Sequence, residues 1–262
     1  MPTPRVLILR APGTNCDHET AFAFERAGGR PELVHINRWL EDPSLPHNFQ
    51  ILCLPGGFSY GDDVAAGRIL ANQIRHHLGE SLAEFKAAGK LILGICNGFQ
   101  VLIKSGVLFP DDPQAGPQAT LTWNDSGQFE DRWIELASTA NECVFLAGIQ
   151  RMYLPVAHAE GKFVVRDAQV LNRLRDRGQL PLRYCSRDGA VREDILPFPE
   201  NPNGSVANVA GACDESGRVL GLMPHPERHV DPLQHPRWTR AIAEGEGDGL
   251  TLFQNAVRFF TA

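Results

Sequence analysis

Residues 94–98, with the sequence GICNG, place one cysteine between two glycines. This pattern is typical of a sharp turn from a strand into a helix, where the glycines leave room and the central side chain is exposed above the strand end. The backbone N–H groups that follow Cys96 would then point outward at the helix N-terminus, where they favour thiolate over thiol and can stabilise an oxyanion. The pattern predicts a cysteine nucleophile. The alternative is a buried structural cysteine beside a glycine turn.

A thiolate nucleophile needs a proton partner, and two His-x-Glu triplets could supply an imidazole with a carboxylate to orient it. His225 and Glu227 follow an apolar strand-like run, and the adjacent prolines favour an extended backbone there. In an extended segment these two side chains would face the same side. His158 and Glu160 form the second triplet. We favour His225 and Glu227 as the catalytic pair because of their position at a strand end and their rigid backbone, and we keep the second triplet as the alternative.

The segment 54–67, LPGGFSYGDDVAAG, is rich in glycine and follows another apolar run. It lacks the Lys-Ser/Thr that completes a phosphate-binding loop, and G-x-G-x-x-G is absent, so nucleotide binding is weakly supported. We expect instead that the N–H group of Gly57 points toward the same oxyanion as that of Asn97. We expect Asp62 and Asp63 to be solvated or to face a partner.

The elements that must position these residues can be predicted from hydrophobic patterning. Short apolar runs, each suited to a strand buried on both faces, occur at 5–9, 32–36, 50–55 and 90–95. Helical patterns lie between them at 18–29 and 78–90, and both end at glycines. A further strand runs into a proline-rich corner within 219–229, and 250–260 resembles a closing amphipathic helix. The alternation predicts an α/β fold with a doubly wound, mostly parallel sheet and flanking helices.

The middle of the chain, about 110–200, is less regular and predicts a small antiparallel insertion. Within it, residues 121–136 resemble two antiparallel strands joined by a turn. No repeat or low-complexity tract divides the chain. We therefore expect one domain over 1–262, with an irregular inserted layer and an extra loop at about 230–249.

Charge and cysteine usage exclude several classes of protein. With 25 Lys and Arg against 31 Asp and Glu, the net charge of −6 argues against a general nucleic-acid binder. The six cysteines show neither CxxC nor CxxxC spacing, so we expect no metal site and no disulfide framework, but buried free thiols in a reducing compartment. No signal peptide or membrane span is apparent, which predicts a cytoplasmic protein.

Six segments taken together resemble the glutaminase subunit of phosphoribosylformylglycinamidine synthase, within the class I (triad) glutamine amidotransferases. These segments are APGTNCDHE, PGGFSYGDDVAAG, GICNGFQVL, HAEGKF, NPNGSVANVAG and GLMPHPERH, between residues 11 and 229. The resemblance covers nearly the whole chain and implies a flavodoxin-like fold. Only the segment 230–249 is longer than expected for the shortest members.

The resemblance implies that Cys96 attacks the side-chain amide of glutamine and forms a glutamyl thioester, while His225 moves the proton and Glu227 orients the imidazole. It also implies residues that hold the oxyanion, Gly57 and Asn97, and residues that contact the substrate, Gly56 and Gln100. Ammonia would pass to a large synthetase partner that uses ATP and magnesium to make formylglycinamidine ribonucleotide from formylglycinamide ribonucleotide in purine biosynthesis. A small third subunit is often present in this family, and no cofactor is expected in this chain.

Two other readings of the sequence are possible. One is a cysteine hydrolase of the same fold, such as a peptidase, a glyoxalase-like enzyme or a γ-glutamyl hydrolase. The other is a non-catalytic assembly module, which would be expected to lack at least one of Cys96, His225 and Glu227. Glutaminases that serve anthranilate or GMP synthesis are closer in chemistry, but the segments NPNGS and FSYGDD point away from them.

Overall fold

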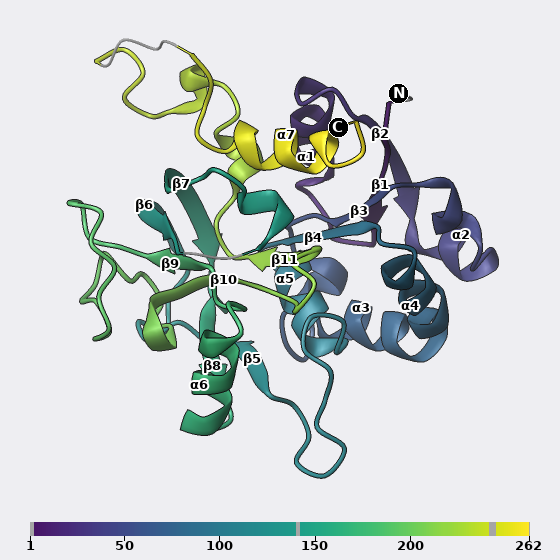
Figure 1. The fold of residues 1–262 in the computed structure, drawn as a ribbon, viewed down its shortest axis with the longest axis horizontal. Coiled ribbons are helices and arrows are strands. Elements are labelled where there is room, and N and C mark those ends of the chain that lie inside the picture. The colour runs from purple at the N-terminus through teal and green to yellow at the C-terminus, as the bar shows by residue number, and fades with distance from the viewer. Residues whose placement is uncertain (1–2, 140–141, 241–244, 262) are drawn as a thin grey trace.

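The computed structural model describes residues 3–139, 142–240 and 245–261. Through them runs a sheet with the strand order β2-β1-β3-β4-β11-β10-β9-β6-β7, and β5 and β8 form a second, two-stranded sheet (Figure 1). The strands are β1 (Arg5–Arg10), β2 (Arg30–His35), β3 (Ile51–Leu54), β4 (Leu91–Ile95), β5 (Ala119–Thr122), β6 (Glu130–Ser138), β7 (Arg151–His158), β8 (Lys162–Val165), β9 (Leu182–Tyr184), β10 (Val209–Cys213) and β11 (Val219–Leu222). The α-helices are α1 (Asp17–Arg26), α2 (Ile36–Glu41), α3 (Arg68–Gln73), α4 (Gly79–Ala87), α5 (Asn97–Lys104), α6 (Ala168–Asp176) and α7 (Leu250–Arg258).

Five neighbouring strands, β2, β1, β3, β4 and β11, pair in parallel. Every residue of β3, β4 and β11 is buried, as expected for strands covered on both faces. The chain passes from β1 outward to β2 and then returns to β3 on the other side of β1. Such a reversal opens a crevice at the carboxyl ends of the strands. The predicted α/β fold with its mostly parallel sheet is confirmed.

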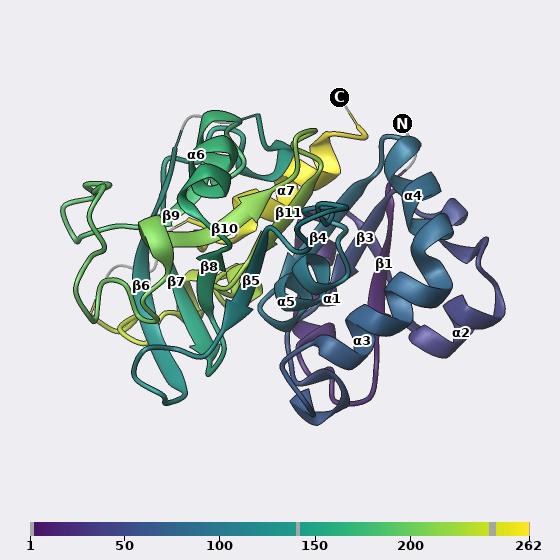
Figure 2. The same cartoon turned by 90° about the horizontal axis from the view of Figure 1, so that it is seen from below.

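Helices cover both faces of this sheet. Helices α1 and α7 lie together over one face, and α3, α4 and α5 lie over the other (Figures 1 and 2). The rings of Phe24 in α1 and Phe253 in α7 meet edge to face, with centroids 4.9 Å apart. Helix α1 has Asp17 and Glu19 in its first turn, where carboxylates interact favourably with the positive end of the helix dipole. Gly28 follows the end of the helix with φ +89°, a conformation that glycine adopts readily.

The antiparallel part does not have the pairing that we predicted from residues 121–136. Strand β5 pairs with β8, whereas β6 pairs with β7 and β9 and continues the main sheet. The predicted hairpin is therefore wrong. The turn between β5 and β6 is present, but the side chain of Asn124 within it donates to the carbonyl of His158 at 2.8 Å. Contacts with residues distant in sequence thus decide the strand partners, which a local pattern cannot reveal.

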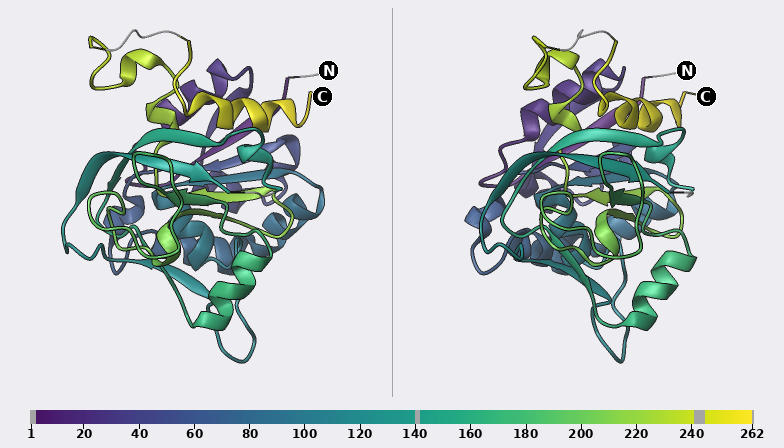
Figure 3. Two further views of the ribbon diagram at one scale, coloured as in Figure 1. Left: turned by 60° about the vertical axis from the view of Figure 1, so that its left-hand side comes forward. Right: turned by 90° about the vertical axis from the view of Figure 1, so that its left-hand side faces the viewer.

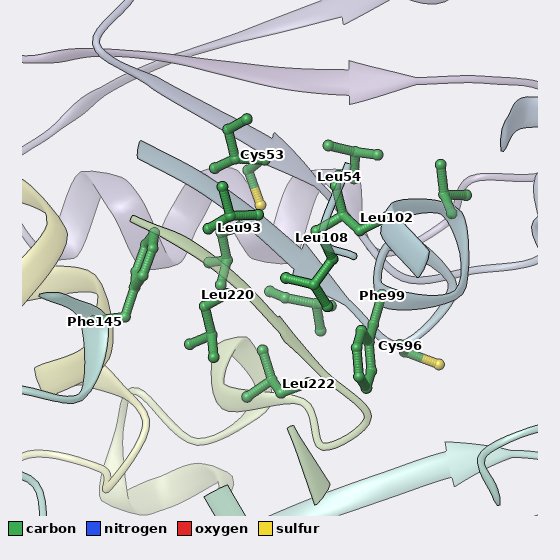
Figure 4. Close-up of a cluster of buried hydrophobic side chains, with 14 of the residues drawn as sticks. Cys53, Leu54, Leu93, Cys96, Phe99, Leu102, Leu108, Phe145, Leu220 and Leu222 are labelled. Carbon is green, nitrogen blue, oxygen red and sulfur yellow. The ribbon is translucent and has the colours of Figure 1, made fainter. Parts of the chain in front are cut away.

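The core is continuous beneath the strands and helices that carry the predicted nucleophile. Figure 4 shows apolar side chains from β4, α5 and β11 in one cluster, with Leu93, Phe99 and Leu220 among them. A Cβ on Gly221 would lie 2.1 Å from the ring of Phe99, so the glycine lets α5 pack directly on β11. This close packing fixes the start of α5 relative to the ends of β4 and β11.

The described parts of the predicted extra loop, 230–240 and 245–249, extend past the sheet on the side of α7 (Figure 3). They contain a short 3₁₀ turn, Pro232–Gln234, which the side chain of Asp231 caps. Among the described residues, no helix has both the length and the apolar character needed to cross a bilayer.

Candidate active site

Cys96 occupies the turn between β4 and α5 in a strained conformation, with φ +50° and ψ −106°. Non-glycine residues at such angles persist only where the surrounding structure imposes them. A Cβ on Gly98 would lie 1.9 Å from the carbonyl oxygen of Leu54, and a Cβ on Gly94 would lie 2.5 Å from the side chain of Leu102. The two glycines therefore allow α5 to approach β3 and β4 closely enough to make this turn.

The sulfur of Cys96 lies at the edge of the apolar cluster and points away from it (Figure 4). The thiol is 5% exposed and lies 3.7 Å from the carbonyl oxygen of Ala157, to which it can donate. The predicted nucleophile is thus nearly enclosed, at the end of a central strand.

His225 and Glu227 are both buried, and Nδ1 of the imidazole lies 2.6 Å from Oε1 of the carboxylate. Burial lowers the pKa of His225, but the charge of Glu227 outweighs it with help from the nearby thiols of Cys96 and Cys16, so this pKa lies well above its usual value. Among the described residues, Nε2 of His225 has no hydrogen-bond partner. Nδ1 is therefore held by a carboxylate, and Nε2 is available for proton transfer.

The backbone that carries this pair differs from the expected extended segment. Residues Pro226–Arg228 form a short 3₁₀ helix, and His225 precedes it at φ −105° and ψ 88°. The expectation of an extended backbone is wrong, since the N–H group of Arg228 bonds back to the carbonyl of His225 and closes a turn. The turn nevertheless brings the imidazole and the carboxylate of Glu227 into contact.

Four neighbouring strand ends meet at this site. Cys16 follows β1, Gly56 follows β3, Cys96 follows β4 and His225 follows β11. A Cβ on Gly56 would lie 2.8 Å from Cε1 of His225, 3.1 Å from the sulfur of Cys16 and 3.4 Å from Cβ of Cys96. The nucleophile, the imidazole and a second thiol therefore converge over one glycine.

The predicted oxyanion donors belong to the segments that follow β3 and β4. Gly57 has φ +132°, and a Cβ there would lie 2.7 Å from the amide nitrogen of Asn15. The loop is held by backbone bonds from Cys16 to the carbonyl of Gly56 and from Phe58 to that of Gly13. The N–H group of Gly57 has no acceptor among the described residues. The N–H group of Asn97 belongs to the first turn of α5, where the helix offers no acceptor.

A hydrogen-bond network behind Asn97 includes Asp62, which we expected to be solvated or partner-facing. Oδ1 of Asp62 accepts from the side chain of Asn97 at 2.9 Å and from the N–H group of Gly67 at 3.3 Å. Burial raises the pKa of Asp62. The expectation is therefore wrong for Asp62, which anchors the glycine-rich loop to α5, and the exposed Asp63 fits it.

Both polar ends of the Gln100 side chain are engaged within the protein. Its Nε2 donates to the carbonyl of Glu160 at 2.7 Å, and its Oε1 accepts from the side chain of Asn97 at 2.9 Å. A direct side-chain contact with a substrate would require one of these bonds to open. The substrate contacts of Gln100 and Gly56 stay predictions.

The alternative triplet is not arranged as a pair. The carboxylate of Glu160 accepts from the N–H group of Ala66 at 3.2 Å, whereas Nδ1 of His158 lies 3.1 Å from the side-chain oxygen of Asn124. Burial, together with the positive charge of His225, lowers the pKa of His158 to about 3. A general base works best with a pKa near the working pH and an orienting partner. The geometry therefore favours His225 and Glu227 for this role.

Cys16 and Arg228 are parts of the site that sequence reasoning missed. A guanidinium nitrogen of Arg228 lies 3.2 Å from the sulfur of Cys16, and the same side chain is bonded to Glu19 at 2.9 Å. Burial raises the pKa of the Cys16 thiol to about 11. The signal in the sequence was position, because Cys16 lies between the first predicted strand and the helix that follows it, as Cys96 lies between the fourth predicted strand and its helix.

Comparisons with known proteins show the family to which the chain belongs. Residues 3–260 match the CobB/CobQ-like glutamine amidotransferase domain family. The chain is 51% identical to "Phosphoribosylformylglycinamidine synthase subunit PurQ" of Dehalococcoides mccartyi, over 97% of each chain. It is 38% identical to the protein of the same name from Methanococcus maripaludis, over 98% of this chain and 97% of that one. A chain in the structure of PurLQS from Thermotoga maritima superposes with a TM-score of 0.74 at 32% identity, covering 99% of this chain and 100% of that one.

Proposed function

The chain belongs to the CobB/CobQ-like glutamine amidotransferase family, and we propose that it serves as the glutaminase subunit of a phosphoribosylformylglycinamidine synthase. The chemistry rests on one observation: buried Cys96 and the imidazole of His225 lie together over Gly56. Nδ1 of this imidazole lies 2.6 Å from the carboxylate of Glu227. A thiol, a base and a carboxylate that orients the base are the parts needed for acyl transfer through a covalent intermediate.

The reaction begins from the pair in which Cys96 has given its proton to Nε2 of His225, a state that the raised pKa of His225 favours. The thiolate sulfur then attacks the side-chain amide carbon of glutamine. The tetrahedral intermediate collapses with cleavage of the carbon–nitrogen bond, and the imidazolium returns the proton to the departing ammonia. His225 then removes a proton from water, which attacks the thioester and releases glutamate and the thiol. Glu227 stabilises the imidazolium in both halves of the reaction.

Charge that develops on the substrate oxygen is stabilised by the backbone N–H groups of Gly57 and Asn97. Preorganised donors of this kind contribute about 3 kcal/mol each when they are aimed at the oxyanion. The strained angles at Cys96 support this role, because they place the sulfur at the N-terminus of α5. Gly56 leaves room above the strand end for the substrate, and Gln100 contacts it once one of its two side-chain hydrogen bonds opens.

Ammonia passes to a larger synthetase partner, which uses ATP and magnesium to convert formylglycinamide ribonucleotide to formylglycinamidine ribonucleotide in purine biosynthesis. The Thermotoga structure, which contains PurL, PurQ and PurS, supports a complex with this partner and a small third subunit. ATP binds to the partner rather than to this chain, and the complex works in the cytoplasm. A cysteine hydrolase of the same fold and a non-catalytic module are disfavoured by the family and by the complete set of Cys96, His225 and Glu227.

The test is glutamate release from glutamine by the chain alone, then with the purified synthetase partner, ATP, magnesium and formylglycinamide ribonucleotide. We expect release to appear, or to rise strongly, only in the complete mixture. Cys96→Ala should abolish glutamine use while ammonia-dependent synthesis by the complex persists, and Cys185→Ala, at a buried thiol outside the site, should leave both intact. No release in any mixture, with the partner active on ammonia, would contradict the proposal and favour the hydrolase or module.

A further inference from the structure

The second thiol at the site has no part in the glutaminase chemistry. Cys16 is 1% exposed, yet it lies next to the imidazole of His225 and not among apolar side chains alone. The ligand atoms of Cys16, His225 and Glu227 all lie within 4.8 Å of one another. Sulfur, imidazole nitrogen and carboxylate oxygen are the donors that zinc prefers in proteins.

The imidazole is oriented as a metal ligand would be. Metal-binding histidines usually donate their second ring N–H to a carboxylate, which fixes the tautomer and raises the basicity of the ligating nitrogen. In His225 that carboxylate is Glu227, and Nε2 is buried without a hydrogen-bond partner in the described residues. This unpartnered nitrogen is a second observation, separate from the cysteine, that points to a ligand.

Cys16 and Cys96 both lie close to Gly56. The Cβ position built on Gly56 lies 3.1 Å from the sulfur of Cys16, 2.8 Å from the ring of His225 and 3.4 Å from Cβ of Cys96. The thiol of Cys96 lies near the same imidazole, whose pKa it helps to raise, so a second sulfur is available close to His225. Zinc bonds are about 2.3 Å to sulfur and about 2.0 Å to nitrogen, so small side-chain movements would close these groups around one ion.

We propose that the site binds one zinc-class divalent ion through the thiolates of Cys16 and Cys96 and through Nε2 of His225, with Glu227 holding the other ring nitrogen. The ion displaces the thiol protons and occupies the lone pair that the base needs. It therefore blocks the glutaminase reversibly, a consequence that rests on the proposed function. The absence of CxxC spacing does not argue against this site, because its ligands come from the ends of three different strands.

Binding of the metal ion to the chain is measured first, in an experiment that does not depend on glutaminase activity. The metal-free full chain, kept reduced with a phosphine, is titrated with Zn²⁺ in equilibrium dialysis and with Co²⁺ in absorption spectroscopy. We expect one ion per chain and a thiolate-to-cobalt charge-transfer band. Cys16→Ser and Cys96→Ser should each weaken Zn²⁺ binding at least about tenfold. Cys185→Ser, at a buried thiol away from His225, is the matched control and should bind as the wild type does.

Inhibition is then measured in the complete synthetase mixture, with each variant compared with itself in the absence of added Zn²⁺. Zn²⁺ should suppress glutamate release by the wild type, a chelator should restore it, and Cys16→Ser should need at least about tenfold more Zn²⁺ for the same suppression. Equal affinity in Cys16→Ser and wild type, equal loss in Cys185→Ser, or no saturable binding would overturn the inference. Zinc binding through Cys16 without any glutamate release would leave the site standing and would overturn the proposed function instead.

Discussion

His225 and His158 are two buried histidines with opposite electrostatics. The carboxylate of Glu227 outweighs burial at His225 and raises its pKa well above the usual value, whereas burial lowers the pKa of His158 to about 3. The difference follows from their partners, since Nδ1 of His158 lies 3.1 Å from the neutral side chain of Asn124 and its Nε2 has no hydrogen-bond partner among the described residues. Residue type alone therefore does not decide which histidine can act as a base.

Replacing Glu227 by glutamine tests the orienting carboxylate. The amide keeps the shape but not the charge, so the imidazolium formed during catalysis loses its stabilisation. We expect kcat for glutamine-dependent synthesis to fall about 10³-fold or more with little change in KM. Steady-state kinetics of the assembled complex gives this value. Glu84→Gln is the control, because Glu84 bonds to His47 at 3.0 Å on the surface, and an equal loss there would contradict the assignment.

The pH dependence of stability tests the state of His158. Because its pKa is lower in the folded chain than the unfolded value of about 6.5, unfolding takes up a proton below pH 6.5, and stability falls as the pH falls from there toward 3. Between pH 6.5 and 5 we expect the wild type to lose about 2 kcal/mol more than His158→Gln, as measured by urea unfolding.

His77→Gln, at an exposed histidine, is the control for this measurement and should keep the wild-type pH dependence. An unchanged pH dependence in His158→Gln would show that His158 is not buried as a neutral group. The raised pKa of His225 acts in a different window. Its stabilisation is complete below about pH 6.5 and is lost as the pH rises through its folded pKa, so it does not obscure the result.

At the scale of elements, the turn between β4 and α5 depends on glycines that bring backbones together. Gly98 lies in the first turn of α5, and its missing side chain allows contact with the end of β3. The motif GICNG therefore does more than supply a nucleophile, because its glycines are also needed for the close packing of β3, β4 and α5. The same packing imposes the strained angles at Cys96.

Two glycine-to-alanine substitutions in helices should have opposite effects. Gly98→Ala would place Cβ 1.9 Å from the carbonyl oxygen of Leu54, which forces α5 away from β3, and we expect a loss of more than about 3 kcal/mol in the free energy of unfolding. Gly79→Ala, at the start of α4 with open space around it, should gain about 0.5 kcal/mol. Urea unfolding of both variants measures the difference, and a tolerated Gly98→Ala would refute the packing argument.

At the scale of the whole molecule, one sheet joins the parallel part, which carries Cys96 and His225, to the antiparallel part that ends at β7. The two parts are also tied by Lys104 of α5, whose ammonium lies 3.8 Å from the carboxylate of Glu160 after β7. Both side chains are largely buried, and burial lowers the pKa of Lys104. Strands β11 and β10 pair where the two parts meet, so separating the parts would leave each of these strands with an unpaired edge.

We therefore expect the chain to unfold in one cooperative transition. Trp39 in α2 is buried beside the parallel strands, and Trp133 belongs to β6 at the far end of the sheet. Variants that keep only one or the other should show the same urea midpoint in tryptophan fluorescence. Two separate midpoints would mean that the antiparallel part is an independent unit.

The sequence by itself determined the parallel strands, the cysteine turn and the family. These follow from local patterns, because a strand buried on both faces must be apolar throughout and a tight strand-to-helix turn needs glycine on both sides of its central residue. The segments at 5–9 and 90–95 needed no knowledge of distant residues to be recognised. The structure has β1 and β4 at these positions, with ends that differ by at most one residue.

Three features were decided only by the tertiary structure. They are the pairing of strands in the antiparallel part, the contact of His225 rather than His158 with a carboxylate, and the position of Cys16 in the site. The separation in sequence between Cys16 and His225 carries no information about their distance. They meet because β1, β3, β4 and β11 lie side by side with their carboxyl ends at one edge. Contacts of this kind depend on the order of strands in the sheet, which is set by the burial of the whole core rather than by any local segment.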